Sequence, residues 1–424
     1  MRNITFFFPY PHISGIPVLF SNLTNYLLET YKSVVNIIDY KDGALINSCD
    51  EHPRLNFIEF KDFEKCIIDF ETHLVLQGGL PNKLRQELVI TNKVKIFMWA
   101  AYEFNFVPYM SRIRVISNLQ RSNLLLHNLF RLLNYKNYRV LSEWVIKMAE
   151  RGSISFMNKP IFETTVKYLF IKNEIHSVKY LPNFGLGNIE YSKRRIVQKS
   201  NEVKKSINLC WLGRIADFKV HILNYSLVEL SKLARIKNSS IIFHIIGSGE
   251  FEDKLMLKCQ HEFFKIIKVG RLEKDQVDKY LFKNIHGIFA MGTSALDGAR
   301  LGLPTILLDQ SYSKVNEGYI FKYLFNAESF DLGHPITNLD FKKGNDSLEK
   351  IIEGFKEEYK NLSDKTIKYF NNNHSINIIC NKFLNKIDGP EYFQYHEIDK
   401  RLLKLGLLRR LYLLYLEKVK KTYY

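Results

Sequence analysis

The sequence predicts an α/β protein with two tandem Rossmann-like, doubly wound domains. Short apolar runs of strand length alternate with amphipathic helical segments along both halves of the chain. The alternation pauses at the turn-rich segment from Pro182 to Gly187 and a charged stretch, and then starts again. A chain of 424 residues is long enough for two such domains. We therefore expect domains at residues 1–187 and 188–375, followed by C-terminal helices and a basic tail at 376–424.

The first half contains seven candidate strands with helical patterns between them. The segment from Val18 to Tyr31 places apolar residues three and four positions apart, which indicates an amphipathic helix. The expected strands are residues 4–8, 34–39, 55–59, 73–77, 94–99, 154–157 and 178–181.

The second half repeats this architecture, although no short sequence repeat is visible. We expect helices at residues 219–235, 250–258, 273–282 and 347–359. The expected strands are residues 207–212, 240–246, 264–269, 287–291 and 305–308. Two such sheets in tandem predict a central ligand cleft between the domains, at the carboxyl ends of the strands, so the residues that follow these strands are the candidate site.

The segment from Gly287 to Pro304 is the most informative of these strand ends. It contains a buried strand, a turn formed by Gly292, Thr293 and Ser294, a short helix, and a stop at Gly302 and Pro304. Free N–H groups at the start of that helix would suit a phosphate. The alternative is an ordinary capping box, in which Ser294 pairs with Asp297 three residues later.

Two cations follow the first strand of the second half. Arg214 comes just after the strand and Lys219 stands where the next helix begins, so together they could clamp a diphosphate. Two unrelated surface cations are the alternative. The next two strand ends are a Gly-x-Gly turn at residues 247–249 and a Val-Gly-Arg-Leu segment at 269–272, each of which also fits a simple tight turn.

Taken in order, these four strand ends resemble the retaining family 4 glycosyltransferases and their two-domain GT-B relatives. Those enzymes have an Arg with a Lys five positions later, then a Gly-x-Gly turn, then a Val-Gly-Arg-like segment. They end with a Glu-Ala-Met-Ala-x-Gly-x-Pro block, which corresponds here to residues 297–304. The resemblance covers roughly residues 205 to 310, and the order and spacing of the motifs are more specific than any one motif.

The resemblance implies a role for each matched residue. Arg214 and Lys219 would stabilise the leaving diphosphate as catalytic residues, and Asp297 would bind ribose hydroxyls. The family has two glutamates eight positions apart: the second corresponds to Asp297, and the first falls on Phe289, which cannot hydrogen-bond a sugar, so the turn at Met291 would replace it. The implied donor-binding residues are Gly15, Gly213, Gly247, Arg271, Leu272, Met291, Gly292, Thr293, Ser294 and Asp297.

Residues after strands of the first half are candidates for the acceptor side. Glu103 could act as a general base beside the aromatic side chains near it, and Tyr102 and Asn105 could contact a sugar. His12 follows the first strand and is a further acceptor-side candidate. The alternatives are a loop histidine without a role, and aromatic residues that belong to the core: Trp99, Phe104 and Phe106.

The net charge of +17 permits an anionic partner, but codon bias toward lysine explains it equally well. No dense Lys/Arg block appears, so we expect no nucleic-acid partner. The leucine-rich basic tail at residues 392–424 could contact an anionic membrane, or it could pack as a helix on the body of the protein. No apolar run reaches the roughly 18 residues of a membrane span.

The five cysteines lie far apart without a C-x-x-C motif, so neither zinc nor a disulfide framework is expected. The N-terminal apolar segment is interrupted by Pro9 and Pro11 and lacks a cleavage site, which favours a cytoplasmic protein. If the basic tail contacts a membrane, the inner face of the cell membrane is the expected location. No Asp-x-Asp motif appears at the strand ends, so we expect no metal and no cofactor.

The sequence thus predicts a glycosyltransferase that moves a hexose from a nucleotide-diphosphate sugar to a glycan or lipid-linked acceptor. Synthesis of cell-surface polysaccharide or lipopolysaccharide is the expected setting, and the resemblance implies retention of anomeric configuration. Two alternatives remain open. One is a nucleotide-sugar epimerase of the same fold, and the other is a non-catalytic binding protein.

Overall fold

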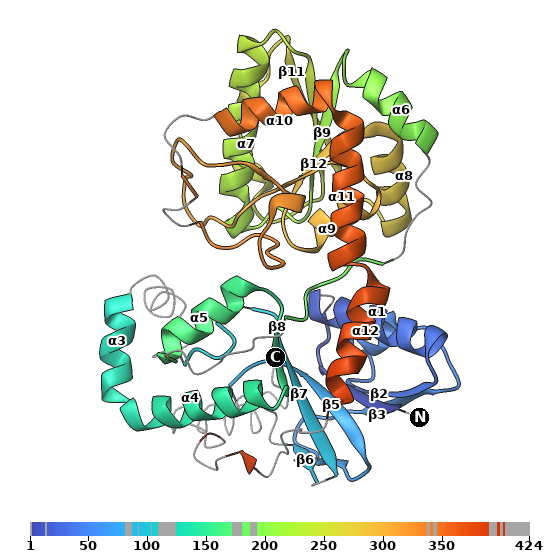
Figure 1. Cartoon of the computed structure of the whole chain (residues 1–424), viewed down its shortest axis with the longest axis vertical. Coiled ribbons are helices and arrows are strands. Elements are labelled where there is room, and N and C mark those ends of the chain that lie inside the picture. The colour runs from blue at the N-terminus through green and yellow to red at the C-terminus, as the bar shows by residue number, and fades with distance from the viewer. Residues whose placement is uncertain are drawn as a thin grey trace. The chain divides into compact units, whose positions relative to one another are not determined.

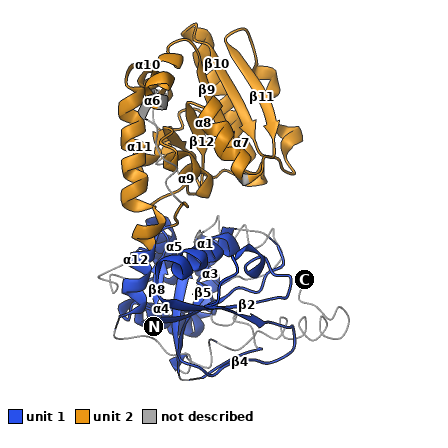
Figure 2. Cartoon of the chain, turned by 90° about the vertical axis from the view of Figure 1, so that its right-hand side faces the viewer, with its two compact units in different colours: residues 1–182, 380–424 blue, residues 183–379 orange. Residues whose placement is uncertain are grey.

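The computed structural model divides the chain into two compact units, shown in different colours in Figure 2. The first unit comprises residues 1–182 and 380–424, and the second comprises 183–379. The described residues are 2–12, 15–80, 87–91, 93–102, 104–108, 124–171, 180–186, 193–336, 340–341, 346–389, 397–398 and 402.

The first unit is built on a six-stranded sheet with the strand order β3-β2-β1-β5-β7-β8, and every neighbouring pair is parallel. Two short strands, β4 and β6, form a separate parallel pair. The strands are β1 (Arg2–Phe7), β2 (Ser33–Asp39), β3 (Leu55–Glu59), β4 (Cys66–Ile68), β5 (Thr72–Gln77), β6 (Leu88–Ile90), β7 (Val94–Ala100) and β8 (Ile154–Phe156). The helices are α1 (Gly15–Thr30), α3 (Leu124–Leu133), α4 (Tyr135–Glu150), α5 (Lys159–Leu169) and, from residue 380 on, α12 (Ile376–Ile387).

Helices cover both faces of this sheet because its central strands are apolar on both sides. On one face, Phe20 of α1 and Phe383 of α12 pack against Trp99 of β7, with ring centroids 6.2 and 6.1 Å from the tryptophan. On the other face, Trp144 of α4 joins a core cluster with Met98 of β7. An ion pair of 2.6 Å between Asp388, just after α12, and Arg2 joins the end of this helix to β1.

The second unit has a six-stranded sheet with the order β11-β10-β9-β12-β13-β14, parallel except for the antiparallel β14. The strands are β9 (Ile207–Leu212), β10 (Ile241–Ile246), β11 (Phe264–Gly270), β12 (Gly287–Ala290), β13 (Thr305–Leu307) and β14 (Lys322–Tyr323). The helices are α6 (Lys193–Glu202), α7 (Asp217–Ile236), α8 (Lys274–Asn284), α9 (Thr293–Arg300), α10 (Asp346–Glu357) and α11 (Tyr359–Asn373).

Alternating side chains of β9 show how this unit forms two cores. Leu209 and Trp211 point into the cluster under α7 and α10, whereas Cys210 and Leu212 point into the cluster under α8, α9 and α11. Figure 1 shows these helices around the sheet of the second unit. The predicted fold class is confirmed, because each unit is a mainly parallel sheet with helices on both faces.

The structure corrects several expected elements. The helix expected at residues 250–258 is instead two single 3₁₀ turns, at Glu252–Lys254 and Leu257–Cys259. Of the strand expected at 178–181, Tyr180 makes one parallel bridge to Phe156, and residues 178–179 lie outside the described part. Residues 380–389, expected as part of a separate tail, group with the first unit.

The basic tail at 392–424 lies outside the described residues except for Glu397, Ile398 and Leu402. Among the helices that are described, none combines the length and the apolar character needed to cross a bilayer.

Candidate functional site

Backbone hydrogen bonds join the turns that follow β9, β10 and β11 in the second unit. The N–H of Gly247, just after β10, donates to the carbonyl of Gly270 at the end of β11 over 2.7 Å. The N–H of Gly213, just after β9, donates to the carbonyl of Ile246 over 3.1 Å. The three turns therefore form one continuous backbone edge at the carboxyl ends of the strands.

Gly247 permits this close approach. It has a φ of +129°, and a Cβ there would stand 2.2 Å from the carbonyl oxygen of Gly213. Gly249 is under the same steric constraint, because a Cβ there would stand 2.2 Å from the carbonyl oxygen of Ile215. Close backbone packing therefore explains both glycines of the Gly-x-Gly turn, whichever ligand this edge binds.

Gly213 lies where several residues predicted to hold a diphosphate meet. A Cβ on Gly213 would stand 3.4 Å from Ser294 Oγ and 3.6 Å from Lys219 Nζ. Lys219 comes from the first turn of α7 and Ser294 from the first turn of α9. Two helix N-termini and a strand end therefore surround one small region, which the absence of a side chain at Gly213 leaves open.

The N-terminus of α9 differs from the capping box that the sequence also allowed. Gly292 is the N-cap residue, with φ +64° and ψ −142°, and no side chain caps the helix. Thr293 and Ser294 are consequently the first two helical residues, whose N–H groups have no intrahelical acceptor. The side chain of Thr293 is exposed. These donors, at the positive end of α9, suit an anion.

Lys219 and Arg214 place positive charge beside these donors. Burial, followed by the nearby charge of Arg214, lowers the pKa of Lys219 from 10.5 to about 8. The ammonium lies 5.9 Å from the ring centroid of Trp211 and 5.6 Å from that of Phe218. Within the described part of the chain, neither cation forms an ion pair with a carboxylate. Two neighbouring cations without counter-ions among the described residues are unfavourable in the free protein, and an anion bound beside them would reduce their repulsion.

The other residues predicted to bind the donor differ in exposure. Asp297 accepts a 3.3 Å hydrogen bond from Nε of Arg300, and its side chain stays 41% exposed. Arg271 is exposed and Leu272 is half-buried. Met291 is buried, so only its backbone can contact a ligand at this edge.

Phe289 is a core residue and lies outside the site. It is fully buried within β12, and its ring centroid lies 5.7 Å from that of Phe243 and 6.0 Å from that of Phe321. A carboxylate at this position would be buried among aromatic rings. The family's first glutamate therefore has no counterpart at this point of the strand.

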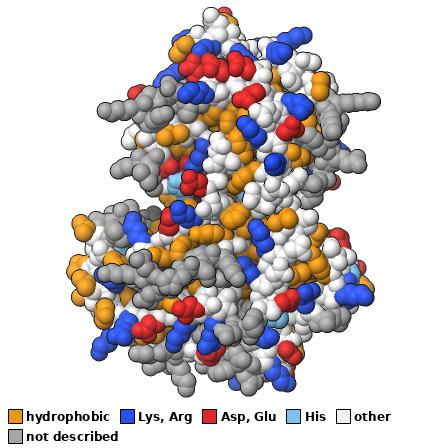
Figure 3. Space-filling model, in the orientation of Figure 1, with side chains coloured by type: hydrophobic (Ala, Val, Ile, Leu, Met, Phe, Trp, Pro, Cys, Tyr) orange, Lys and Arg blue, Asp and Glu red, His pale blue; other side chains and the backbone are white. Residues whose placement is uncertain are grey.

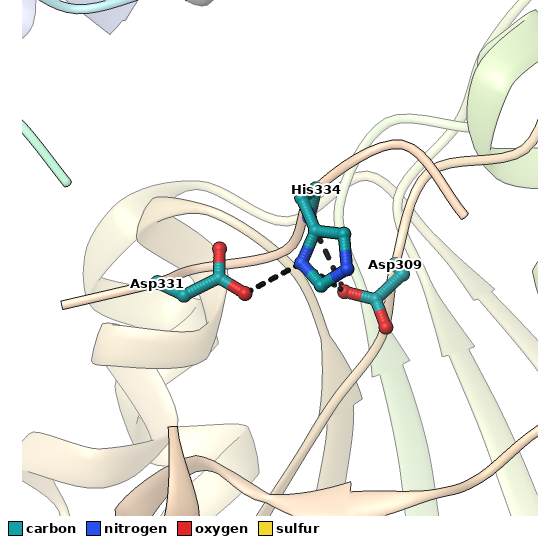
Figure 4. Close-up of side chains that lie close together, drawn as sticks. All are labelled: Asp309, Asp331 and His334. Atoms are coloured by element: carbon teal, nitrogen blue, oxygen red, sulfur yellow. Dashed lines mark hydrogen bonds and ion pairs between the residues drawn. The ribbon is translucent and has the colours of Figure 1, made fainter. Parts of the chain in front are cut away.

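Sequence reasoning missed a charged cluster that supports the Gly292 turn. Asp309 follows β13, and Asp331 and His334 belong to a later loop that folds back to it. Figure 4 shows the imidazole of His334 between the two carboxylates. Its Nδ1 lies 2.7 Å from Asp331 Oδ2 and 3.4 Å from Asp309 Oδ1.

This loop contacts the predicted phosphate turn directly. The N–H of Gly292 donates to the carbonyl of Leu332 over 2.7 Å. Gly333 has a φ of +102°, and a Cβ there would stand 3.1 Å from the Cβ of Met291. The only sequence signal was Asp-Leu-Gly-His at 331–334, in a region without helix or strand periodicity.

The cluster contains two cations, His334 and Lys322, and three carboxylates, because Asp340 also lies 3.2 Å from Nε2 of His334. Burial lowers the pKa of His334, but hydrogen bonds to Asp331 and Asp340 outweigh burial and raise it to about 10, so the imidazole is a cation at neutral pH. Lys322 adds a second cation, 3.4 Å from Asp309 Oδ2. Ligand atoms of Asp309, Asp331 and His334 lie within 4.8 Å of one another, a spacing that a metal ion could use. His334 and Lys322 already form ion pairs with Asp309 and Asp331, so the cluster fits an internal ion-pair network better than a metal site.

The predicted acceptor-side residues lie in the first unit. His12 is exposed, with its ring edge-on to Tyr10 at 5.6 Å. Gly15, predicted to bind the donor, also lies in this unit, as the exposed first residue of α1. Asn105 Oδ1 accepts a 2.7 Å hydrogen bond from the N–H of Tyr102, so this side chain holds the turn after β7. Glu103 lies outside the described residues.

Two of the aromatic residues in this region belong to the core, as the alternative interpretation expected. Trp99 is buried and donates from Nε1 to the carbonyl of Leu181 over 2.8 Å, and Phe106 is fully buried. Phe104 is half-buried. Tyr102 is 37% exposed, so its ring is more accessible than those of Trp99, Phe104 and Phe106.

Surface charge is mixed on the face drawn in Figure 3. Among the described residues there, Lys and Arg side chains are interspersed with Asp and Glu in both units. A nucleic-acid groove would need a basic stripe. The expectation of no nucleic-acid partner stays a prediction.

Comparison with known proteins places the fold. Neither a protein-family model nor any curated protein sequence matches the chain. Among solved structures, it is similar to a glycosyltransferase from Rickettsia africae ESF-5, with a TM-score of 0.53 and 11% identity over 91% of this chain and 97% of the other. The N-terminal domain of Candida albicans trehalose-6-phosphate phosphatase gives a TM-score of 0.53 and 13% identity over 92% and 97%.

The chain has the GT-B fold. Two Rossmann-like units, each with a mainly parallel sheet between helical layers, define it. At 11–13% identity these neighbours show the architecture alone.

Proposed function

We propose that the protein is a glycosyltransferase that uses a nucleotide-diphosphate sugar. The observation that carries this proposal is a pair of cations, Lys219 and Arg214, without acidic partners among the described residues, beside the open N-terminus of α9. A diphosphate supplies the missing negative charge and accepts hydrogen bonds from the N–H groups of Thr293 and Ser294. The neighbouring turns at Gly247 and Arg271 would meet the rest of the nucleotide, and Asp297 its ribose.

In the proposed reaction, the bond between the anomeric carbon and the diphosphate breaks, the oxygen of an acceptor hydroxyl bonds to that carbon, and the hydroxyl proton passes to the released diphosphate. Negative charge grows on the leaving diphosphate, which would lie next to the Lys219 ammonium and the first N–H groups of α9. Groups that are fixed before the reaction stabilise such charge without reorganising. No nucleophilic side chain of the second unit is required, and metal independence and retention are parts of this proposal.

The acceptor is proposed to be a glycan or a lipid-linked glycan of the cell surface. Residues of the first unit, such as His12 and Tyr102, would contact it. A labelled nucleotide-sugar panel with mixed glycan acceptors, with and without EDTA, tests the reaction. We expect transfer that survives EDTA and is lost in Lys219→Met, and NMR of the product reports the anomeric outcome.

The same panel without acceptor separates the rival functions. An epimerase would interconvert sugars and exchange a sugar proton with solvent when no acceptor is present. A non-catalytic protein would bind nucleotide without turnover. Wild-type protein that neither binds any nucleoside diphosphate nor transfers any sugar would refute the proposal.

A further inference from the structure

Two loops of the second unit connect the starts of the two helices that form the proposed diphosphate site. We call residues 309–311 and 331–334 the linking loops. In the first loop, the N–H of Ser311 donates to the carbonyl of Phe218, in the first turn of α7, over 2.9 Å. In the second, the carbonyl of Leu332 accepts from the N–H of Gly292, the N-cap of α9, over 2.7 Å. Each loop therefore contacts one of the two helix starts.

Close packing accompanies each of these hydrogen bonds. The ring of Tyr312, directly after the first loop, lies 6.0 Å from that of Phe218, whose own centroid is 5.6 Å from Nζ of Lys219. In the second loop, a Cβ on Gly333 would stand 3.1 Å from the Cβ of Met291, the residue before the α9 turn. A displacement of either loop would therefore be passed on to the helix start beside it.

Hydrogen bonds join the two loops to each other through Asp309 and His334. The N–H of His334 donates to Oδ1 of Asp309 over 3.2 Å, and the N–H of Gln310 donates to the carbonyl of His334 over 2.7 Å. Asp309 is fully buried, and its Oδ2 accepts from the hydroxyl of Tyr319 over 2.8 Å. Asp331 holds the imidazole of His334 on the other side, as Figure 4 shows. A hydrogen-bonded path thus links the starts of α7 and α9.

We propose that Asp309 and His334 are positioning residues of the diphosphate site. Through the linking loops they fix the distance between Nζ of Lys219 and the first N–H groups of α9, so that one diphosphate reaches both. The inference rests on the proposed function, because it concerns the same anion, but neither residue contacts the ligand itself. Groups that are fixed in advance bind a ligand without the cost of ordering them, so loosening the loops should weaken binding.

Calorimetric titration of the full chain with pyrophosphate at pH 7 tests the proposal. We expect His334→Asn to bind about tenfold more weakly than wild type. Asp331→Asn keeps an oxygen for the N–H of Gly333 and should show a smaller loss of the same kind. The matched control is His286→Asn. His286 is a buried histidine, 3.2 Å from a carboxylate oxygen of Glu202, but it precedes β12 at the opposite edge of the sheet, so this variant should bind like wild type.

A double-mutant cycle separates positioning from general destabilisation and from long-range attraction by the imidazolium. The Lys219→Met variant has no ammonium left to position, so adding His334→Asn should weaken binding less than about twofold further. Circular dichroism and the thermal midpoint show that each variant is folded. Unchanged affinity in folded His334→Asn overturns the proposal, as does an equal loss in His286→Asn or a tenfold loss that persists with Lys219→Met. Wild type that binds no pyrophosphate would refute the diphosphate site itself, and this inference with it.

Discussion

Replacing Lys219 with methionine should stabilise the ligand-free protein while it weakens binding of diphosphates. Methionine keeps much of the length and apolar character of the side chain but removes the charge. In the free protein that charge is half-buried, next to Arg214 and without an acidic partner among the described residues. The substitution therefore removes a cost to folding and, with it, an attraction for the ligand.

The magnitude follows from the pKa of Lys219, which falls from 10.5 to about 8. A shift of one unit corresponds to about 1.4 kcal/mol, and partial exposure reduces the effect, so we expect a gain of about 1–3 kcal/mol at neutral pH. Because the folded pKa is lowered, the cost is complete below pH 8 and disappears as the pH rises toward 10.5. The advantage of the variant should disappear over the same range.

Denaturant unfolding of wild type and Lys219→Met at several pH values measures this difference. Comparing the two proteins at each pH cancels the titration of other groups, including His334. Calorimetric titration with pyrophosphate, which needs no knowledge of the base, measures the binding side. A variant that is less stable than wild type at pH 7, or that binds pyrophosphate equally well, would refute the reasoning.

The remaining predictions concern the same edge of the second sheet. Pyrophosphate affinity of wild type should fall roughly tenfold from pH 7 to pH 9, as Lys219 loses its proton, and Lys219→Met should show little of this slope by the same titration. Gly247→Ala should lower the free energy of unfolding, measured with denaturant, by about 3 kcal/mol or more, because its Cβ would overlap the carbonyl of Gly213. The matched control is Gly270→Ala, at which φ is +79° and no atom lies within 4 Å of the new Cβ. This control should lose only about 1 kcal/mol. Equal losses would contradict this steric reading. His334→Asn should destabilise the protein most below pH 6.5, with a deficit that shrinks as the pH rises toward 10, since the raised pKa means that the stabilising cation is lost over that range. A deficit that does not change with pH would mean that the imidazole acts as a neutral group.

Most strands could be predicted from the sequence because buried parallel strands are continuous apolar runs. β9, β10 and β12 have apolar side chains on both faces and were found within one or two residues. The segment at 250–258 has helical composition but forms two 3₁₀ turns. There, Asn224 of α7 accepts from the N–H of Met256 and donates to the carbonyl of Lys254. Tertiary hydrogen bonds of this kind leave no local pattern.

The site was predictable only where residues follow strands directly. Gly213, Lys219 and Ser294 could be placed together because parallel strands end at one edge of a sheet. Asp331 and His334 could not, because their position depends on a long loop that folds back to Asp309 and to the Gly292 turn. Contacts between segments far apart in sequence have no periodic signal.

The most direct test of the account is a crystal structure of the protein with a bound nucleoside diphosphate. We predict that the phosphates lie within hydrogen-bond distance of the N–H groups of Thr293 and Ser294 and of Nζ of Lys219. Phosphates found elsewhere, with none near Nζ of Lys219, would contradict it.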